Sequence, residues 1–131
     1  MERNAVNPWQ WSVAMGFNQG EVVTGATRTL FCAGQTSVDA DGAAVNPGDM
    51  AAQITKALDN LEAVLGEGGM SLADVVRLNI YTTDVDLFFE HYGALASRTG
   101  AAGVAPPGTL LGVARLAYPE LLVELEATAV Q

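Results

Sequence analysis

The chain has 131 residues, half of them hydrophobic, and its 15 acidic and 6 basic side chains give a formal net charge of -9 at pH 7. The length suits one compact domain, and the negative charge counts against nucleic acid or an anionic membrane as a partner. The single cysteine excludes an intrachain disulfide. No apolar run is long enough to span a bilayer and no secretion signal opens the chain, so a cytoplasmic protein is expected.

Residues 1–16 are predicted to form an N-terminal arm of a single domain that spans residues 1–131. The arm contains Trp9 and Trp11, whose rings would lie on the same side of an extended segment. Two interpretations remain open. The rings form a hydrophobic wall or lid over a cleft, or they fasten the arm to the body of the protein or to a neighbouring subunit.

Two strands are predicted over residues 17–25 and 27–35, where β-branched and aromatic residues are frequent. Their core candidates are Val22, Val23, Leu30 and Phe31. Cys32 has no positive charge or helix N-terminus close in sequence to lower its pKa, so it is predicted to be a small buried hydrophobic side chain. The Asp- and Gly-rich segment 38–43 lacks the later ligands of a calcium loop and is predicted to be a loop.

A first helix is predicted with Asn46 as its cap and Pro47 in its first turn, and it ends at the glycines of residues 66–69. Its apolar residues recur at helical spacing, so this helix is expected to pack on a sheet. A second helix is predicted from the cap Asp84 to about Arg98.

Between the helices, residues 75–82 predict a strand with one apolar face. The opposite face is polar and would suit a surface between subunits; it carries Arg77, Asn79 and Tyr81. His91, the only histidine, is interpreted as a surface residue of the second helix rather than a general base, because it has no ligand partner at useful spacing.

The C-terminal residues predict a hairpin. The turn Pro106-Pro107-Gly108 opens a strand of about eight residues, a short turn follows, and residues 121–129 alternate between apolar and polar side chains. This alternation places Glu124 and Glu126 on one face, because successive side chains of a strand point to opposite sides. The sequence therefore predicts a site near these two carboxylates.

The run Pro-Pro-Gly-Thr-Leu-Leu-Gly-Val-Ala-Arg-Leu over residues 106–116, followed by Glu-Leu-Glu-Ala-Thr-Ala, resembles the C-terminal signature of the Rid family, also called YjgF or L-PSP. Other segments agree with it: Gly34-Gln35 after a strand, Asp59-Asn60-Leu61 in a helix, and Tyr81-Thr82-Thr83-Asp84 at the end of a strand. The resemblance extends from about Gly16 to Val130 with the order of elements intact.

This resemblance implies an α+β fold like that of chorismate mutase, with a mixed sheet, two helices on one face, and homotrimers that have clefts between subunits. The best-known branch of the family hydrolyses reactive enamines or imines to 2-keto acids and ammonia. In that branch an arginine two residues after the proline holds the substrate carboxylate, and here that position is Gly108. Glycine has no guanidinium to bind a carboxylate, so the chain resembles a divergent member.

Ala33 and Phe17 stand where the family has a serine and a tyrosine, so two hydroxyl groups are also missing. Glu124 matches the family glutamate near the ligand or its attacking water and is the predicted catalytic residue. The predicted substrate contacts are Phe17, Ala33, Gly34, Gly108, Thr109 and Arg77. Main-chain amides near Gly108 and Thr109 would stabilise negative charge.

Arg77 is a candidate replacement for the missing arginine; the alternative is a salt bridge to Glu124 or Glu126. Arg115 is interpreted as structural. No cofactor or metal ion is expected, and the substrate should depend less on a carboxylate. Two functions remain open: a hydrolase of an enamine, imine or related small metabolite, and a non-catalytic trimer that binds a small ligand or a partner. A Glu124 sealed by Arg77 or Arg115 would count against the hydrolase, whereas a Glu124 open to water would favour it.

Overall fold

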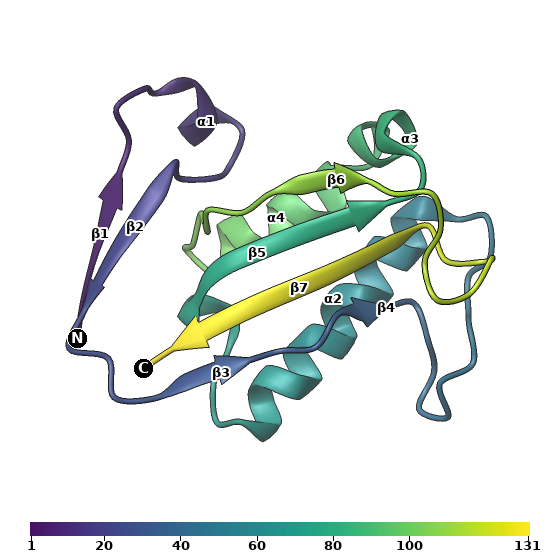
Figure 1. Ribbon diagram of the computed structural model, residues 1–131, viewed down its shortest axis with the longest axis horizontal. Coiled ribbons are helices and arrows are strands. Elements are labelled where there is room, and N and C mark those ends of the chain that lie inside the picture. The colour runs from purple at the N-terminus through teal and green to yellow at the C-terminus, as the bar shows by residue number, and fades with distance from the viewer.

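A five-stranded mixed sheet forms the body of the protein in the computed structural model, which describes residues 1–131 (Figure 1). The long C-terminal strand β7 (Val123–Val130) lies inside this sheet. It pairs antiparallel with β3 (Thr29–Phe31), β4 (Gln35–Thr36) and β5 (Val75–Thr82). The edge strand β6 (Leu110–Gly112) pairs in parallel with β5.

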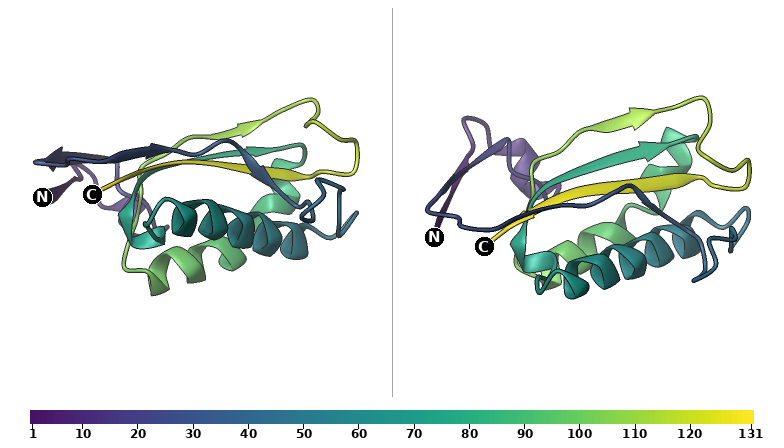
Figure 2. Two further views of the ribbon diagram at one scale, coloured as in Figure 1. Left: turned by 90° about the horizontal axis from the view of Figure 1, so that it is seen from below. Right: turned by 60° about the horizontal axis from the view of Figure 1, so that its bottom comes forward.

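The helices cover one face of this sheet, as the edge-on view in Figure 2 shows. They are α2 (Met50–Glu67), α3 (Val85–Glu90) and α4 (Gly93–Ala101), with a short 3₁₀ helix at Leu72–Asp74 before β5. The predicted α+β class, a mixed sheet with helices on one face, is confirmed. None of the helices combines the length and the apolar composition needed to cross a membrane.

The core lies between the sheet and the helices, chiefly α2. Alternate residues of β7 point into it, and they are Val123, Leu125, Ala127 and Ala129. From α2, Leu58 and Leu61 are fully buried, and burying a leucine side chain contributes about 1.5–3 kcal/mol. Cys32 belongs to the same core, and burial raises the pKa of its thiol, so the prediction of a buried hydrophobic cysteine is confirmed.

A second, two-stranded sheet stands at one end of the molecule (Figure 1). It pairs β1 (Glu2–Val6) with β2 (Gly20–Thr24), and the short helix α1 (Trp11–Ala14) lies between them. Arg3 anchors this hairpin to the body: its guanidinium contacts Glu21 and donates hydrogen bonds to the carbonyl oxygens of Ala73 (2.5 Å) and Val75 (2.9 Å).

This arrangement corrects several predictions for the N-terminal part. Trp11 is in a helix rather than an extended segment, so the strand geometry that would place the rings of Trp9 and Trp11 on one side does not apply. The predicted strands are shorter than expected, and they lie in different sheets. Val22 and Phe31 are 51% and 79% exposed and do not belong to the core. Both residues do lie in strands, as their β-propensity predicts, but propensity does not indicate which face of a strand is buried.

Two helix predictions are also corrected. Asp49, rather than Asn46, caps α2, and its side chain accepts a hydrogen bond from the amide of Ala52 at 3.0 Å. Asn46 has a positive φ of 59°, a conformation that asparagine tolerates better than most residues. The second predicted helix does begin after Asp84, but the chain breaks at His91 and Tyr92 into α3 and α4.

The predicted C-terminal hairpin is wrong. β6 and β7 do not pair with each other, because β5 lies between them and bonds to both. The loop over residues 113–122 crosses the end of β5, a distance of two strand spacings, or about 10 Å. β6 is also shorter than the predicted eight residues. The alternation predicted for residues 121–129 is nevertheless correct.

Candidate functional site

Glu124 lies on the face of the sheet opposite the helices, here called the outer face, because its neighbours Val123 and Leu125 point into the core. Its carboxylate rests directly over the main chain of Gly34, and even a methyl group at residue 34 would overlap it. Glu124 is partly exposed and makes no side-chain hydrogen bond or ion pair within the chain. No other side chain of the protomer therefore competes with a ligand or a water molecule for this carboxylate.

Next to Glu124, a hydrogen-bonded cluster surrounds Glu126. The carboxylate of Glu126 accepts hydrogen bonds from Asn79 Nδ2 at 3.0 Å and from the Tyr81 hydroxyl at 3.2 Å. Asn79 Oδ1 in turn accepts a hydrogen bond from the amide of Thr109 at 3.1 Å. Partial removal from water raises the pKa of Tyr81, and the negative charge of Glu126 raises it further. The cluster links the turn before β6 to the outer face.

The predicted salt bridge from Arg77 to Glu124 or Glu126 is wrong. Arg77 is exposed on the outer face and forms no ion pair within the chain. It lies opposite Thr128 in the sheet register, whereas Asn79 and Tyr81 donate hydrogen bonds to the carboxylate of Glu126. Arg115 donates only to the carbonyl oxygen of Ala117, at 3.3 Å. Neither arginine seals Glu124.

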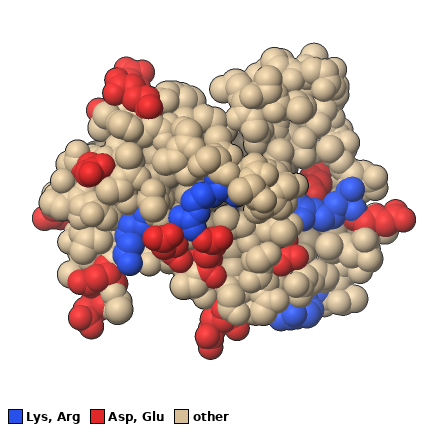
Figure 3. Space-filling view, turned by 180° about the vertical axis from the view of Figure 1, so that it is seen from behind, with Lys and Arg blue, Asp and Glu red and all other residues tan.

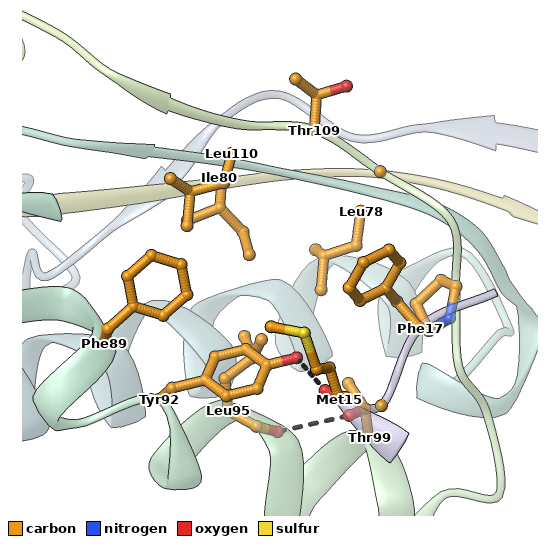
Figure 4. Close-up of a pocket in the computed structure, with 13 residues that line it drawn as sticks. Met15, Phe17, Leu78, Ile80, Phe89, Tyr92, Leu95, Thr99, Thr109 and Leu110 are labelled. Atoms are coloured by element: carbon orange, nitrogen blue, oxygen red, sulfur yellow. Dashed lines mark hydrogen bonds between the residues drawn. The ribbon is translucent and has the colours of Figure 1, made fainter. Parts of the chain in front are cut away.

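A cavity of about 190 Å³ opens on the other side of the same sheet edge. Its walls come from three parts of the chain (Figure 4): the inner face of β5 and β6, the helices α3 and α4, and the segment after α1. The lining residues are Met15, Gly16, Phe17, Leu78, Ile80, Phe89, Tyr92, Leu95, Thr99, Pro106, Gly108, Thr109 and Leu110. We call this cavity the edge pocket, and none of these residues is charged.

The break between α3 and α4 shapes the edge pocket. It places Tyr92 so that its hydroxyl donates a hydrogen bond to the carbonyl oxygen of Met15 at 2.6 Å. Burial raises the pKa of this hydroxyl. The amide of Asn18 donates to the carbonyl oxygen of Ala105 at 2.8 Å and fastens the same segment from the other side. The segment at residues 15–17 is thus held as a wall of the pocket.

Gly108 lies too close to the main chain of β5 to carry a side chain. The amides of Leu78 and Ile80 donate to the carbonyl oxygens of Pro107 and Thr109, at 3.1 and 2.8 Å. These bonds extend the parallel pairing of β5 and β6 through the turn, and a methyl group on Gly108 would overlap the carbonyl oxygen of Leu78. The path of the main chain at residue 108 therefore leaves no room for an arginine side chain. The amide of Thr109 is already bonded to Asn79, so it is not free to stabilise charge on a ligand.

The predicted site residues fall into two groups within one protomer. Phe17, Gly108 and Thr109 line the edge pocket. Glu124 and Gly34 meet on the outer face, with Ala33 next to Gly34 and Arg77 on the same face.

Sequence reasoning missed the parts that Phe89, Tyr92 and Asn79 play. The polar face of residues 75–82 was a visible signal for Asn79. The one local signal for the break that turns Phe89 and Tyr92 toward the pocket was Gly93, which has a low helix propensity. No group of three or more His, Cys, Asp or Glu side chains is placed to hold a metal ion.

Comparison with known proteins gives concordant results. The family model described as Endoribonuclease L-PSP matches residues 10–131. A RutC family protein of Pyrococcus abyssi is 31% identical over 100 residues, which are 76% of each chain. The 2-iminobutanoate/2-iminopropanoate deaminase of Escherichia coli K12 is 31% identical over 88 residues, which are 65% of this chain and 66% of the deaminase.

Among solved structures, YyfB of Yersinia pestis, a Rid family protein of unknown function, covers both chains completely with 37% identity and a TM-score of 0.86. The similarity thus includes the N-terminal residues as well as the sheet and helices.

Proposed function

The chain belongs to the Rid family, also called YjgF or L-PSP, and we propose that it forms a homotrimer in which clefts between subunits hydrolyse a reactive enamine or imine, or a related small metabolite. The deaminase name of the E. coli relative supports this reaction class. The substrate differs from the 2-imino acids of that relative, because Gly108 provides no cation for a carboxylate.

The distribution of exposed apolar side chains supports assembly through the outer face. Phe31 is 79% exposed there at one edge of the sheet, and Leu111 is 48% exposed at the other. Contact with neighbouring subunits would remove these side chains from water. Assembly would also explain why one protomer separates Glu124 from the edge pocket, since a cleft between subunits can combine groups from two faces.

The unpaired carboxylate of Glu124 carries the catalytic proposal. Glu124 accepts a proton from a water molecule whose oxygen attacks the carbon of the C=N bond, and that bond becomes a single bond. Glu124 returns this proton to the nitrogen, which gives a neutral carbinolamine. The second proton of the attacking water, now on the hydroxyl group, then passes to the nitrogen as the C–N bond breaks, so that ammonia leaves and the carbon becomes a carbonyl. The amide of Gly108, which donates no hydrogen bond within the chain, can stabilise negative charge at the site.

A ribonuclease function, which the name of the family model suggests, fits the charge distribution poorly. The net charge is -9, and on the face shown in Figure 3 the basic side chains lie among acidic ones. Arg98, for example, is paired with Asp59 and Glu62. A phosphate backbone is usually bound by clustered basic side chains.

The first test is hydrolysis of two freshly generated imines, a 2-imino acid and a neutral imine without a carboxylate. We expect the neutral imine to be hydrolysed faster than in buffer and the 2-imino acid to be the poorer substrate. Glu124→Gln should lower the rate on the neutral imine about 100-fold or more, the usual effect of losing a general base.

Glu67→Gln, at the exposed end of α2, is the matched control and should keep full activity. Sedimentation of each variant should give three times the 13.6 kDa chain mass. Equal rates for wild type and Glu124→Gln would remove Glu124 from the mechanism. Wild type that hydrolyses neither imine would favour the second candidate function, a non-catalytic trimer that binds a small ligand or a partner. The loss of the arginine and of two hydroxyl groups favours that alternative.

A further inference from the structure

The polar side chains around the edge pocket are already hydrogen-bonded or point elsewhere. Tyr92 donates its hydroxyl proton to the carbonyl oxygen of Met15. Thr99 Oγ1 lies 3.3 Å from the carbonyl oxygen of Ala96, to which it donates. The side chain of Thr109 points away from the pocket in Figure 4, so only its main chain contributes to the wall. The interior therefore offers a ligand almost only apolar surface.

The shape of the edge pocket suits one planar ring. The rings of Phe17, Phe89 and Tyr92 surround a common space with Leu78 and Ile80 (Figure 4). The volume is about 190 Å³, and a dry apolar cavity of roughly 150 Å³ binds benzene in an engineered protein. Aromatic walls favour an aromatic guest through edge-to-face and offset contacts.

A carboxylate would be poorly accommodated in the same space. A buried charge without a partner carries a large desolvation penalty, and the lining contains no lysine, arginine or histidine. Gly108 stands at the wall where the family resemblance predicts a cation. The net charge of -9 adds a further repulsion for anions.

We propose that the edge pocket binds an uncharged, mainly apolar molecule about the size of one aromatic ring, and that the substrate of the site carries such a group. The assignment of substrate class rests on the proposed function, whereas binding to the pocket is independent of hydrolysis. The main-chain amide of Gly108 donates no hydrogen bond within the chain, and it points away from β5 at the free edge of the sheet, because the Pro107 carbonyl of the same trans peptide points toward β5. A carbonyl or similar neutral acceptor on the ring is therefore the group that this amide can bind at the mouth of the pocket.

Benzamide and benzoate form a matched pair of probes, because they have nearly the same shape and differ in charge. The chain has two isoleucines, Ile80 in the pocket wall and Ile54 in the core on α2. In full-length protein with labelled isoleucine methyl groups, benzamide should shift the NMR signal of Ile80 and leave that of Ile54 unchanged. We expect benzamide to bind with a dissociation constant of about 1 mM or below and benzoate at least about tenfold more weakly.

Two phenylalanine variants locate the binding. Phe89→Ala removes a wall of the pocket and should weaken benzamide binding about tenfold, while Phe31→Ala, on the outer face, should not change it. Glu124→Gln should also bind benzamide normally. Benzoate binding as tight as benzamide, no shift at Ile80 with either probe, or an unaffected Phe89→Ala would each overturn the proposal. Benzamide binding at Ile80 without imine hydrolysis would reject the catalytic function and retain the pocket.

Discussion

The two sides of the central sheet edge differ in what they offer a ligand. The outer face carries the groups that can accept or donate a proton, Glu124 and the cluster of Asn79, Tyr81 and Glu126, but none of these residues lines the edge pocket. The edge pocket has concave, partly open apolar space and no ionisable side chain except that of Tyr92. One face can do chemistry and the other can hold a molecule, so a functioning site needs both.

Each side also contains a glycine that approaches a neighbour too closely for a side chain, but the neighbours differ. Gly108 abuts the carbonyl oxygen of Leu78, a main-chain atom fixed in the pairing of β5 with β6. Gly34 abuts the carboxylate of Glu124, the far end of a flexible side chain. The first contact constrains the fold, whereas the second constrains the position of the candidate catalytic group.

The largest effect is expected from Gly108→Ala. The new methyl group would force the turn away from β5, and we expect the free energy of unfolding to fall by about 3 kcal/mol, in the upper part of the range for overpacking. Gly100→Ala, in α4, is the matched control, because nothing lies within 4 Å of a Cβ added there. It should be neutral or stabilising by about 0.5–1 kcal/mol.

Urea denaturation of both variants at the same protein concentration measures this difference, because assembly makes apparent stability depend on concentration. If Gly108→Ala were as stable as wild type, the turn would be free to move. Restoring an arginine at residue 108 would then be a simple change of side chain.

A smaller change in stability, but a loss of function, is expected from Gly34→Ala. The methyl group would displace the carboxylate of Glu124, which can rotate away, so unfolding should become easier by no more than about 1.5 kcal/mol. Hydrolysis of the neutral imine should fall toward the rate of Glu124→Gln, and benzamide binding should stay unchanged. Full activity in Gly34→Ala would show that the position of Glu124 over Gly34 is not needed.

Sequence patterns predicted those parts of the fold that local periodicity determines. The alternation at residues 121–129 and the apolar stripe of α2 reflect burial against a single partner, and both were predicted correctly. Strand order was not predictable in this way. The closeness of β6 and β7 in sequence favours a hairpin, whereas the structure places β5 between them.

The candidate site was predictable only residue by residue. The family resemblance pointed to Glu124, Gly34 and Gly108, and the structure gives Gly34 and Gly108 a steric reason to be glycine. The family resemblance could not indicate that Phe17 and Glu124 lie on opposite sides of the sheet edge. The break at His91 and Tyr92 was also not predicted, because the apolar residues on both sides of it recur at helical spacing and a single glycine, Gly93, does not by itself end a helix.

The smallest expected effect compares one tyrosine from each side. The pKa of Tyr81 is raised by partial removal from water and then by the carboxylates Glu126 and Glu124, whereas burial alone raises the pKa of Tyr92. Raising the salt concentration to about 1 M shortens the Debye length to about 3 Å. It should therefore lower the pKa of Tyr81 and leave that of Tyr92 nearly unchanged.

Titration of tyrosinate absorbance in Tyr81→Phe and Tyr92→Phe separates the two groups. A raised pKa means that the folded state keeps its proton after the unfolded state, with a pKa of about 10, has lost it. Stability from both tyrosines is thus complete below about pH 10 and falls as the pH rises through the folded pKa values. Salt should reduce this alkaline loss in Tyr92→Phe, which retains Tyr81, but not in Tyr81→Phe. The same salt response in both variants would mean that the carboxylates of the outer face do not act on Tyr81.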